Sequence, residues 1–107
     1  MDHWILNEQG EPRKADLMTW AQWFDDVEAR RVARTELANG GYVSTVFLGL
    51  DHGWGEGPPI LWETMLFSDE IGEKWQERYT SREDALRGHE EMVVRAKEAL
   101  GARNEDV

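Results

Sequence analysis

The chain lacks cysteine and is poor in basic side chains. Because none of its 107 residues is cysteine, disulfides, thiolate catalysis and cysteine-ligated metals are excluded. Its 22 Asp and Glu residues outnumber 12 Lys and Arg residues, which gives a formal net charge of −10. Direct binding to nucleic acid or to an anionic membrane needs a positive surface, so we expect neither. The charge favours a protein partner with a basic surface, although an acidic exterior is also common for solubility alone.

Long hydrophobic runs are also missing. No segment approaches the ~20 apolar residues of a membrane span, and MDHWILNEQGEP is not typical of a signal peptide. We therefore expect a cytoplasmic protein. An apolar content of 40% with six tryptophans is enough for one modest core. Residues 1–107 are predicted to form a single domain, with an N-terminal strand and turn over residues 1–15 and a frayed tail over residues 102–107.

The N-terminal third predicts a strand, a turn and a helix. Residues 3–6 are apolar and suit a short edge strand, and NEQGEP after them is typical of a turn. Asp16 suits a helix N-cap, and the following apolar spacing predicts a helix over residues 17–28. Its apolar stripe consists of Leu17, Trp20, Ala21, Phe24 and Val27.

The next segment predicts a β-hairpin. The Asn-Gly pair within ANGG favours a type I′ turn between strands at residues 31–37 and 42–50. A two-residue turn there places Arg34 opposite Thr45 and Val32 opposite Phe47. Because the second strand is apolar at nearly every position, we expect it to be central and covered on both faces.

The C-terminal half predicts two more strands and a helix. Residues 60–67 suit a third strand, and residues 74–80 a solvated edge strand. Ser81 and Asp84 resemble a capping box that opens a helix running to Leu100, with Gly101 as the residue that ends it. Its predicted inner face consists of Ala85, His89, Met92, Val93, Ala96 and Leu100. The predicted fold class is α+β, an antiparallel meander of three to five strands packed against two helices.

The loop DHGWGEGPP carries the residues that suggest chemistry. Asp51 and His52 stand where a predicted strand ends, and with His89 they suit a zinc or manganese site if the three converge. Glu63 or Glu56 is the alternative to His89 as the residue that completes such a site. The chain has no HExxH motif, so we predict no metal, no cofactor and no catalytic residue. In the structural alternative, His52 bonds to the loop backbone, Trp54 covers the sheet edge and His89 donates to a backbone carbonyl or to Glu63.

Other catalytic signatures are missing as well. Ser44 and Ser68 lack the glycine-flanked turn of a hydrolase nucleophile. The glycine loop lacks the lysine and the hydroxyl residue of a phosphate-binding loop. We therefore expect the protein not to be an enzyme.

One stretch of the chain is purely acidic. Between residues 51 and 73 there are six carboxylates and no basic side chain, which predicts one continuous negative face. Trp23 and Trp54 are the tryptophans expected to be exposed, where they suit an interface anchor or a homodimer contact. Trp4, Trp20, Trp62 and Trp75 are expected inside. The predicted interaction surface consists of Asp51, Trp54, Glu56, Asp69, Glu70 and Glu73.

The segment GLDHGWGEGPPILWETMLF, with TWAQWF before it and RYTSREDALRGHEEMV after it, carries a resemblance. The chain resembles a group of small phage- and prophage-encoded proteins in which GLDH, a glycine-aromatic loop, GPP and an ETM strand recur in this order. The likeness covers roughly residues 17 to 95. It implies a viral or mobile-element origin, and it brings no activity and no functional residue to this chain.

Three hypotheses about function follow from these features. The first is a phage accessory protein that binds a host or phage protein, for instance an anti-CRISPR-like inhibitor of a nucleic-acid-handling defence system. It predicts a complex that weakens steeply with salt. The second is a small metal-dependent enzyme or metal-binding module that uses Asp51, His52 and His89. The third is a virion or packaging component that self-associates through Trp54 and its loop.

Overall fold

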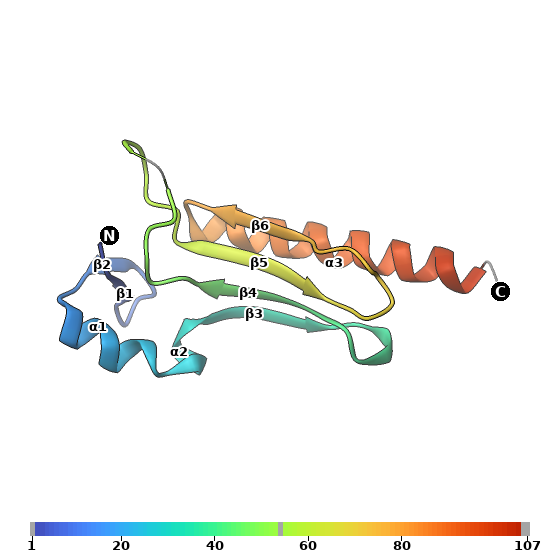
Figure 1. The fold of residues 1–107 in the computed structure, drawn as a ribbon, viewed down its shortest axis with the longest axis horizontal. Coiled ribbons are helices and arrows are strands. Elements are labelled where there is room, and N and C mark those ends of the chain that lie inside the picture. Colours follow the sequence, from blue (N-terminus) through green and yellow to red (C-terminus); the bar gives the residue numbers. More distant parts are fainter. Residues whose placement is uncertain (1, 54, 106–107) are drawn as a thin grey trace.

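The fold is α+β, with one four-stranded antiparallel sheet and a separate two-stranded hairpin (Figure 1). The computed structural model describes residues 2–53 and 55–105, with side chains as far as residue 101. The strand order is β1-β2 in the hairpin and β3-β4-β5-β6 in the sheet. The elements are β1 (Trp4–Leu6), β2 (Pro12–Lys14), α1 (Leu17–Phe24), α2 (Val27–Arg30), β3 (Arg31–Glu36), a 3-10 turn (Ala38–Gly40), β4 (Tyr42–Phe47), β5 (Trp62–Phe67), β6 (Gln76–Tyr79) and α3 (Arg82–Glu105).

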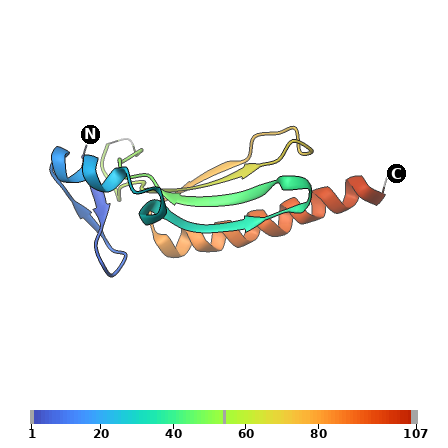
Figure 2. The same ribbon diagram turned by 90° about the horizontal axis from the view of Figure 1, so that it is seen from below.

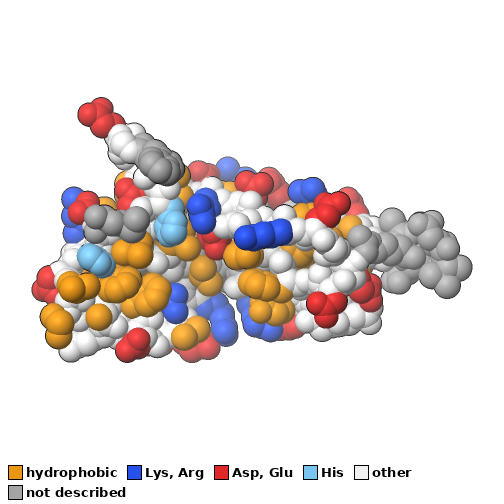
Figure 3. Space-filling view, viewed as in Figure 1, with side chains coloured by type: hydrophobic (Ala, Val, Ile, Leu, Met, Phe, Trp, Pro, Cys, Tyr) orange, Lys and Arg blue, Asp and Glu red, His pale blue; other side chains and the backbone are white. Residues whose placement is uncertain are grey.

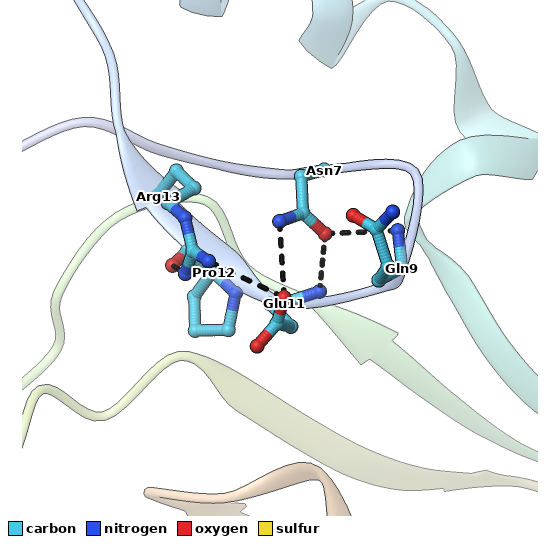
Figure 4. A network of polar contacts seen from close by, with 5 residues as sticks. All are labelled: Asn7, Gln9, Glu11, Pro12 and Arg13. Atoms are coloured by element: carbon cyan, nitrogen blue, oxygen red, sulfur yellow. Dashed lines mark hydrogen bonds and ion pairs between the residues drawn. The ribbon is translucent and has the colours of Figure 1, made fainter.

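The N-terminal hairpin turns at the predicted position, within NEQGEP. Asn7 Oδ1 accepts hydrogen bonds from the backbone N–H groups of Gln9 and Glu11, each at 2.9 Å, and its amide donates to the Glu11 carboxylate (Figure 4). Gly10 adopts a φ of 78°, which a side chain would strain. The sequence did not predict β2, because Pro-Arg-Lys shows no strand periodicity and is held extended only by pairing with β1.

The predicted helix over residues 17–28 is two helices. Asp16 caps α1 as expected, since its carboxylate accepts from the Thr19 N–H at 2.8 Å. Asp26 caps α2 in the same way and accepts from the Ala29 N–H at 3.1 Å. When the Asp26 carboxylate accepts from a free N–H group at the start of α2, it favours a new helix over continuation of α1. The prediction of a single helix over residues 17–28 is therefore wrong.

The loop of the β3–β4 hairpin is one residue longer than the predicted two-residue turn. Both residues of the Asn-Gly pair have positive φ, 61° and 83°, as the turn signal requires. The loop has three residues, however, because the Leu37 N–H donates to the Gly41 carbonyl at 2.7 Å. Arg34 therefore pairs with Ser44 and not with Thr45.

A β-bulge interrupts β3 near its start. Arg31 pairs with Val46 whereas Ala33 pairs with Thr45, so Val32 between them is the extra residue of the bulge. The cross-strand partner predicted for Val32 is therefore wrong. Because a bulge changes which face a side chain points to, this irregularity also decides the composition of both faces of the sheet.

Only one face of the sheet is covered by a helix within the described residues. α3 runs beneath all four strands, and the opposite face is open (Figure 2). Val43, Thr45 and Phe47 of β4 are buried against α3, while the alternate residues of the strand are half-buried. The prediction that both faces of this strand are covered is therefore wrong. Its continuous apolar pattern reflects β-propensity as well as burial.

The core lies between the sheet and α3. All six residues predicted for the inner face of the helix are buried. Ser81 Oγ accepts from the Asp84 N–H at 3.1 Å, which confirms the predicted cap. The predicted end is wrong, because Gly101 lies inside α3, which continues to Glu105. In the part of the chain that the structure describes, no helix is both long and apolar enough to cross a membrane.

Candidate functional site

The Asp51–His52 segment forms the base of the glycine loop. The Asp51 carboxylate accepts hydrogen bonds from the N–H groups of Gly53 (2.8 Å) and Ile60 (2.9 Å). These two hydrogen bonds hold the pKa of the Asp51 carboxyl below its ordinary value, and the bond from Gly53 has the larger effect. The His52 backbone N–H donates to the Ile60 carbonyl at 3.0 Å. Asp51 is therefore engaged in closing the loop. Trp54 lies outside the described residues, so its predicted contact role stays a prediction.

Glu63 is removed from any open acidic face. It is buried on β5, and its carboxylate lies 2.9 Å from Arg78 Nε on the neighbouring strand. Gln76 donates a second hydrogen bond to the same oxygen. Glu63 is therefore a paired cross-strand residue of the sheet.

The remaining acidic residues lie at opposite ends of the sheet. Glu56 is exposed in the loop after β4, whereas Asp69, Glu70 and Glu73 lie on the β5–β6 connection (Figure 1). Glu70 accepts a hydrogen bond from Asn39 on the β3–β4 turn. The prediction of one continuous negative face over residues 51–73 is therefore wrong, because β5 separates its two ends. That these carboxylates contact a partner stays a prediction.

His89 is a core residue with both ring nitrogens engaged. Nε2 lies 2.9 Å from the Thr35 hydroxyl and Nδ1 lies 2.8 Å from the Thr45 hydroxyl. The expected bonds to a carbonyl or to Glu63 are therefore replaced by bonds to two threonines. Burial lowers the pKa of His89, so the ring is held neutral.

The residues suggested for a metal do not converge. His89 is bonded beneath the middle of the sheet, whereas Asp51 and His52 belong to the loop base. Across residues 2–53 and 55–105, no three or more His, Asp or Glu side chains are grouped to hold a metal ion. The hypothesis of an Asp51–His52–His89 site is therefore wrong.

A different surface stands out on α1. None of the eight residues of this helix is buried, although most of LMTWAQWF is apolar. Leu17 exposes 59% of its surface and Met18 exposes 70%, while Val27 at the start of α2 exposes 56%. Ala21 is also exposed and, four residues after Leu17, lies on the same side of the helix. We call Leu17, Met18, Ala21 and Val27 the α1 surface.

Aromatic side chains next to the α1 surface attach the helix to the rest of the molecule. Trp20 donates from Nε1 to the Gly49 carbonyl at 3.1 Å, and its ring stacks on Phe24 with centroids 4.6 Å apart. Trp23 packs edge-on against Phe47, 5.6 Å between centroids. Trp23 is therefore half-buried and not the exposed anchor that was predicted. These aromatic contacts fix the helix so that its aliphatic side faces outward.

Carboxylates lie beside the α1 surface in sequence and in space. Asp16 precedes the helix, Asp25 and Asp26 follow it, and Glu28 lies in α2. Figure 3 shows hydrophobic side chains gathered over this end of the molecule, with acidic side chains at their margin. Of the four carboxylates, Glu28 has an ion-pair partner, Arg31, at 3.1 Å within the described residues.

The apolar stripe over residues 17–27 is the signal for this surface in the sequence. A helical stripe of apolar residues usually marks a buried face, whereas Leu17, Ala21 and Val27 of this stripe are exposed. The acidic residues that crowd the end of this stripe distinguish it from the inner face of α3. Which side chains of this short amphipathic helix are covered depends on aromatic contacts with His3 and Phe47, which spacing alone does not give.

Comparison of the chain with protein-family models, curated proteins and solved structures finds no match.

Proposed function

We propose that this protein acts by binding another protein through the α1 surface. The observation that carries the proposal is the outward aliphatic side of α1, where Leu17 and Met18 each expose more than half of their surface. Full burial of an exposed aliphatic side chain of this size contributes about 1.5–3 kcal/mol, and the larger part of the surface of both side chains is still exposed to water. Contiguous exposed apolar surface with a polar border is characteristic of protein interaction sites.

The charge around the α1 surface favours a basic partner. Asp16, Asp25 and Asp26 border it, and the whole chain carries a net charge of −10. A partner surface with an apolar centre and Lys or Arg around it is complementary to this arrangement. Among such partners, a nucleic-acid-handling defence protein with a basic channel fits the acidity best. Binding of this protein in the basic channel would exclude nucleic acid from it, which is how an anti-CRISPR-like inhibitor would act.

The test compares two double variants for capture of a partner from the host cell. Leu17→Ser with Met18→Ser removes the aliphatic side of α1. The matched control, Leu86→Ser with Val94→Ser, removes two exposed aliphatic side chains from α3. Because all four side chains are exposed, each substitution is expected to change the free energy of unfolding by no more than about 0.5 kcal/mol. Circular dichroism melting confirms that both variants are folded.

We expect the wild type and the α3 control to retain the partner and the α1 variant to lose it. The purified complex should weaken steeply between about 0.1 M and about 0.5 M salt and should displace an oligonucleotide from the partner. Capture that is equal for both double variants, or insensitive to salt, contradicts the proposal. Sedimentation of the pure protein is the second arm. A homodimer that the α1 variant abolishes would assign the α1 surface to a second copy of the chain instead.

A further inference from the structure

A groove on the open face of the sheet concentrates positive charge in this acidic protein. It has a volume of about 200 Å³ and lies where α2 meets β3, β4 and β5. Figure 3, which views this face, shows basic side chains gathered over α2 and β3. We call it the arginine groove, and the lining residues that matter here are Arg30, Arg31, Arg34, Tyr42, Val46 and Phe67.

The β-bulge brings two of the arginines to the same side of the sheet. In a regular strand, residues three apart point to opposite faces, so Arg31 and Arg34 would be separated by the sheet. The bulge at Val32 shifts Arg31 to pair with Val46, while Arg34 pairs with Ser44. Both arginines then share the face of β4 that is not covered by α3. Bulges that redirect a side chain in this way are frequent next to functional sites.

An aromatic row forms the other side of the arginine groove. The Arg34 guanidinium lies 3.8 Å from the centroid of the Tyr42 ring. Tyr42 stacks in turn on Phe67, with centroids 4.7 Å apart and an angle of 22° between the rings. Phe67 keeps 41% of its surface exposed. The groove therefore offers the partly exposed ring of Phe67 beside its cationic groups.

The three guanidinium groups are available to an anion. Arg30 stacks on Phe24 at 3.8 Å, forms no ion pair with any described carboxylate, and has a buried Nε without a hydrogen-bond partner. Arg31 and Arg34 pair with Glu28 and Glu36, at 3.1 Å and 2.7 Å, on the outside of the molecule. Exposed pairs of this kind contribute about 0–1 kcal/mol, so a doubly charged ligand can replace them.

From this geometry we propose that the arginine groove binds a small phosphate monoester with a planar ring, such as a nucleoside monophosphate. The phosphate lies among Arg30, Arg31 and Arg34, whose planar forks match its oxygens. The ring of the ligand lies against Phe67, because Arg34 and Phe67 already cover the two faces of Tyr42. A longer polynucleotide is disfavoured, because the groove is small and the net charge of −10 repels a polyanion. Val27 of the α1 surface also lines the groove, whereas Leu17 and Met18 do not, so substitutions of Leu17 and Met18 test the two proposals separately.

The test is titration of the full chain with adenosine monophosphate. Binding is measured by isothermal calorimetry and by NMR of the backbone amides. We expect saturable binding and shifts at β3, β4 and α2. Arg31→Gln and Arg34→Gln are each expected to weaken binding about tenfold, since each removes a charge-assisted bidentate contact. The matched control is Arg13→Gln, which removes one exposed arginine from the β1–β2 hairpin and is expected to change binding less than twofold.

A second variant tests the aromatic side and does not depend on the arginines. Phe67→Leu keeps an apolar side chain but removes the ring. It should therefore weaken the binding of adenosine monophosphate and leave the affinity for inorganic phosphate unchanged. Adenosine alone should bind more weakly than its monophosphate. No saturable binding, equal loss in Arg13→Gln, or equal affinity for inorganic phosphate and the nucleotide would overturn the proposal. The Leu17→Ser/Met18→Ser variant should bind the nucleotide as the wild type does, whatever becomes of its protein partner.

Discussion

The Nδ1 atom of His89 lies 2.8 Å from the hydroxyl of Thr45 and so joins the long helix to the middle of the sheet. The same hydroxyl lies 2.6 Å from that of Thr64 on the next strand, and Thr35 holds the other ring nitrogen. This polar chain lies between two apolar clusters, one around Phe47 and one around Val93. Because each group is satisfied only when α3 and three strands are aligned, the network favours one packing arrangement.

Acid should weaken the fold through His89. Burial lowers the pKa of its imidazole in the folded state, so the unfolded chain binds a proton more readily. The stabilising contribution is fully present above about pH 6.5, the ordinary value for a histidine, and is lost as the pH falls toward the lowered value. Urea unfolding at several pH values measures this. In the His89→Gln variant the free energy of unfolding should no longer fall over this pH range. The same slope of free energy against pH in the variant and in the wild type would contradict the prediction.

Removal of one hydroxyl should disturb the whole network. Thr45→Val keeps the volume but leaves His89 Nδ1 and Thr64 without that partner, at a cost of about 1–3 kcal/mol in the free energy of unfolding. Ser44→Ala on the same strand is the control, because Ser44 lies on the open face. It is expected to change stability by less than about 0.5 kcal/mol. Equal effects of the two substitutions would show that the network does not stabilise the fold.

Two glycines of α3 should respond to alanine with opposite signs. A Cβ at Gly88 would lie 1.9 Å from the Tyr79 hydroxyl, so Gly88→Ala forces the Tyr79 ring out of its place against the helix, at about 1–3 kcal/mol. At Gly101 a Cβ meets nothing within 4 Å, and alanine should stabilise the helix by about 0.5–1 kcal/mol. Thermal melting distinguishes the two. Adding Tyr79→Leu to Gly88→Ala should recover part of the loss, and strict additivity would argue against the clash.

The glycine loop should open when Asp51 is removed. Asp51→Ala deletes the acceptor of the Gly53 and Ile60 N–H groups, so hydrogen exchange of the Ile60 amide should become faster. Since these bonds lower the pKa of Asp51, its contribution is present above its ordinary value of 3.8 and lost as the pH falls through the lowered value. Glu56→Ala, exposed in the same loop, is the control and should leave the exchange of Ile60 unchanged.

Local hydrogen bonds and side-chain periodicity made several elements readable in the sequence. The caps at Asp16 and Ser81 and the positive φ of the Asn-Gly turn were predicted from neighbouring residues and are confirmed. The inner face of α3 was predicted from helical spacing and is confirmed in full. These features depend on interactions over a few residues, which the order of amino acids states directly.

Tertiary structure decided how these elements meet, and with that the surfaces on which function depends. The three-residue turn and the bulge at Val32 set which side chains share a face, and they bring Arg31 and Arg34 together. Leu17 and Met18 of α1 face outward because the neighbouring Trp20, Trp23 and Phe24 attach the helix to the fold. Register and burial depend on contacts between segments far apart in the chain, whose energies no local pattern contains.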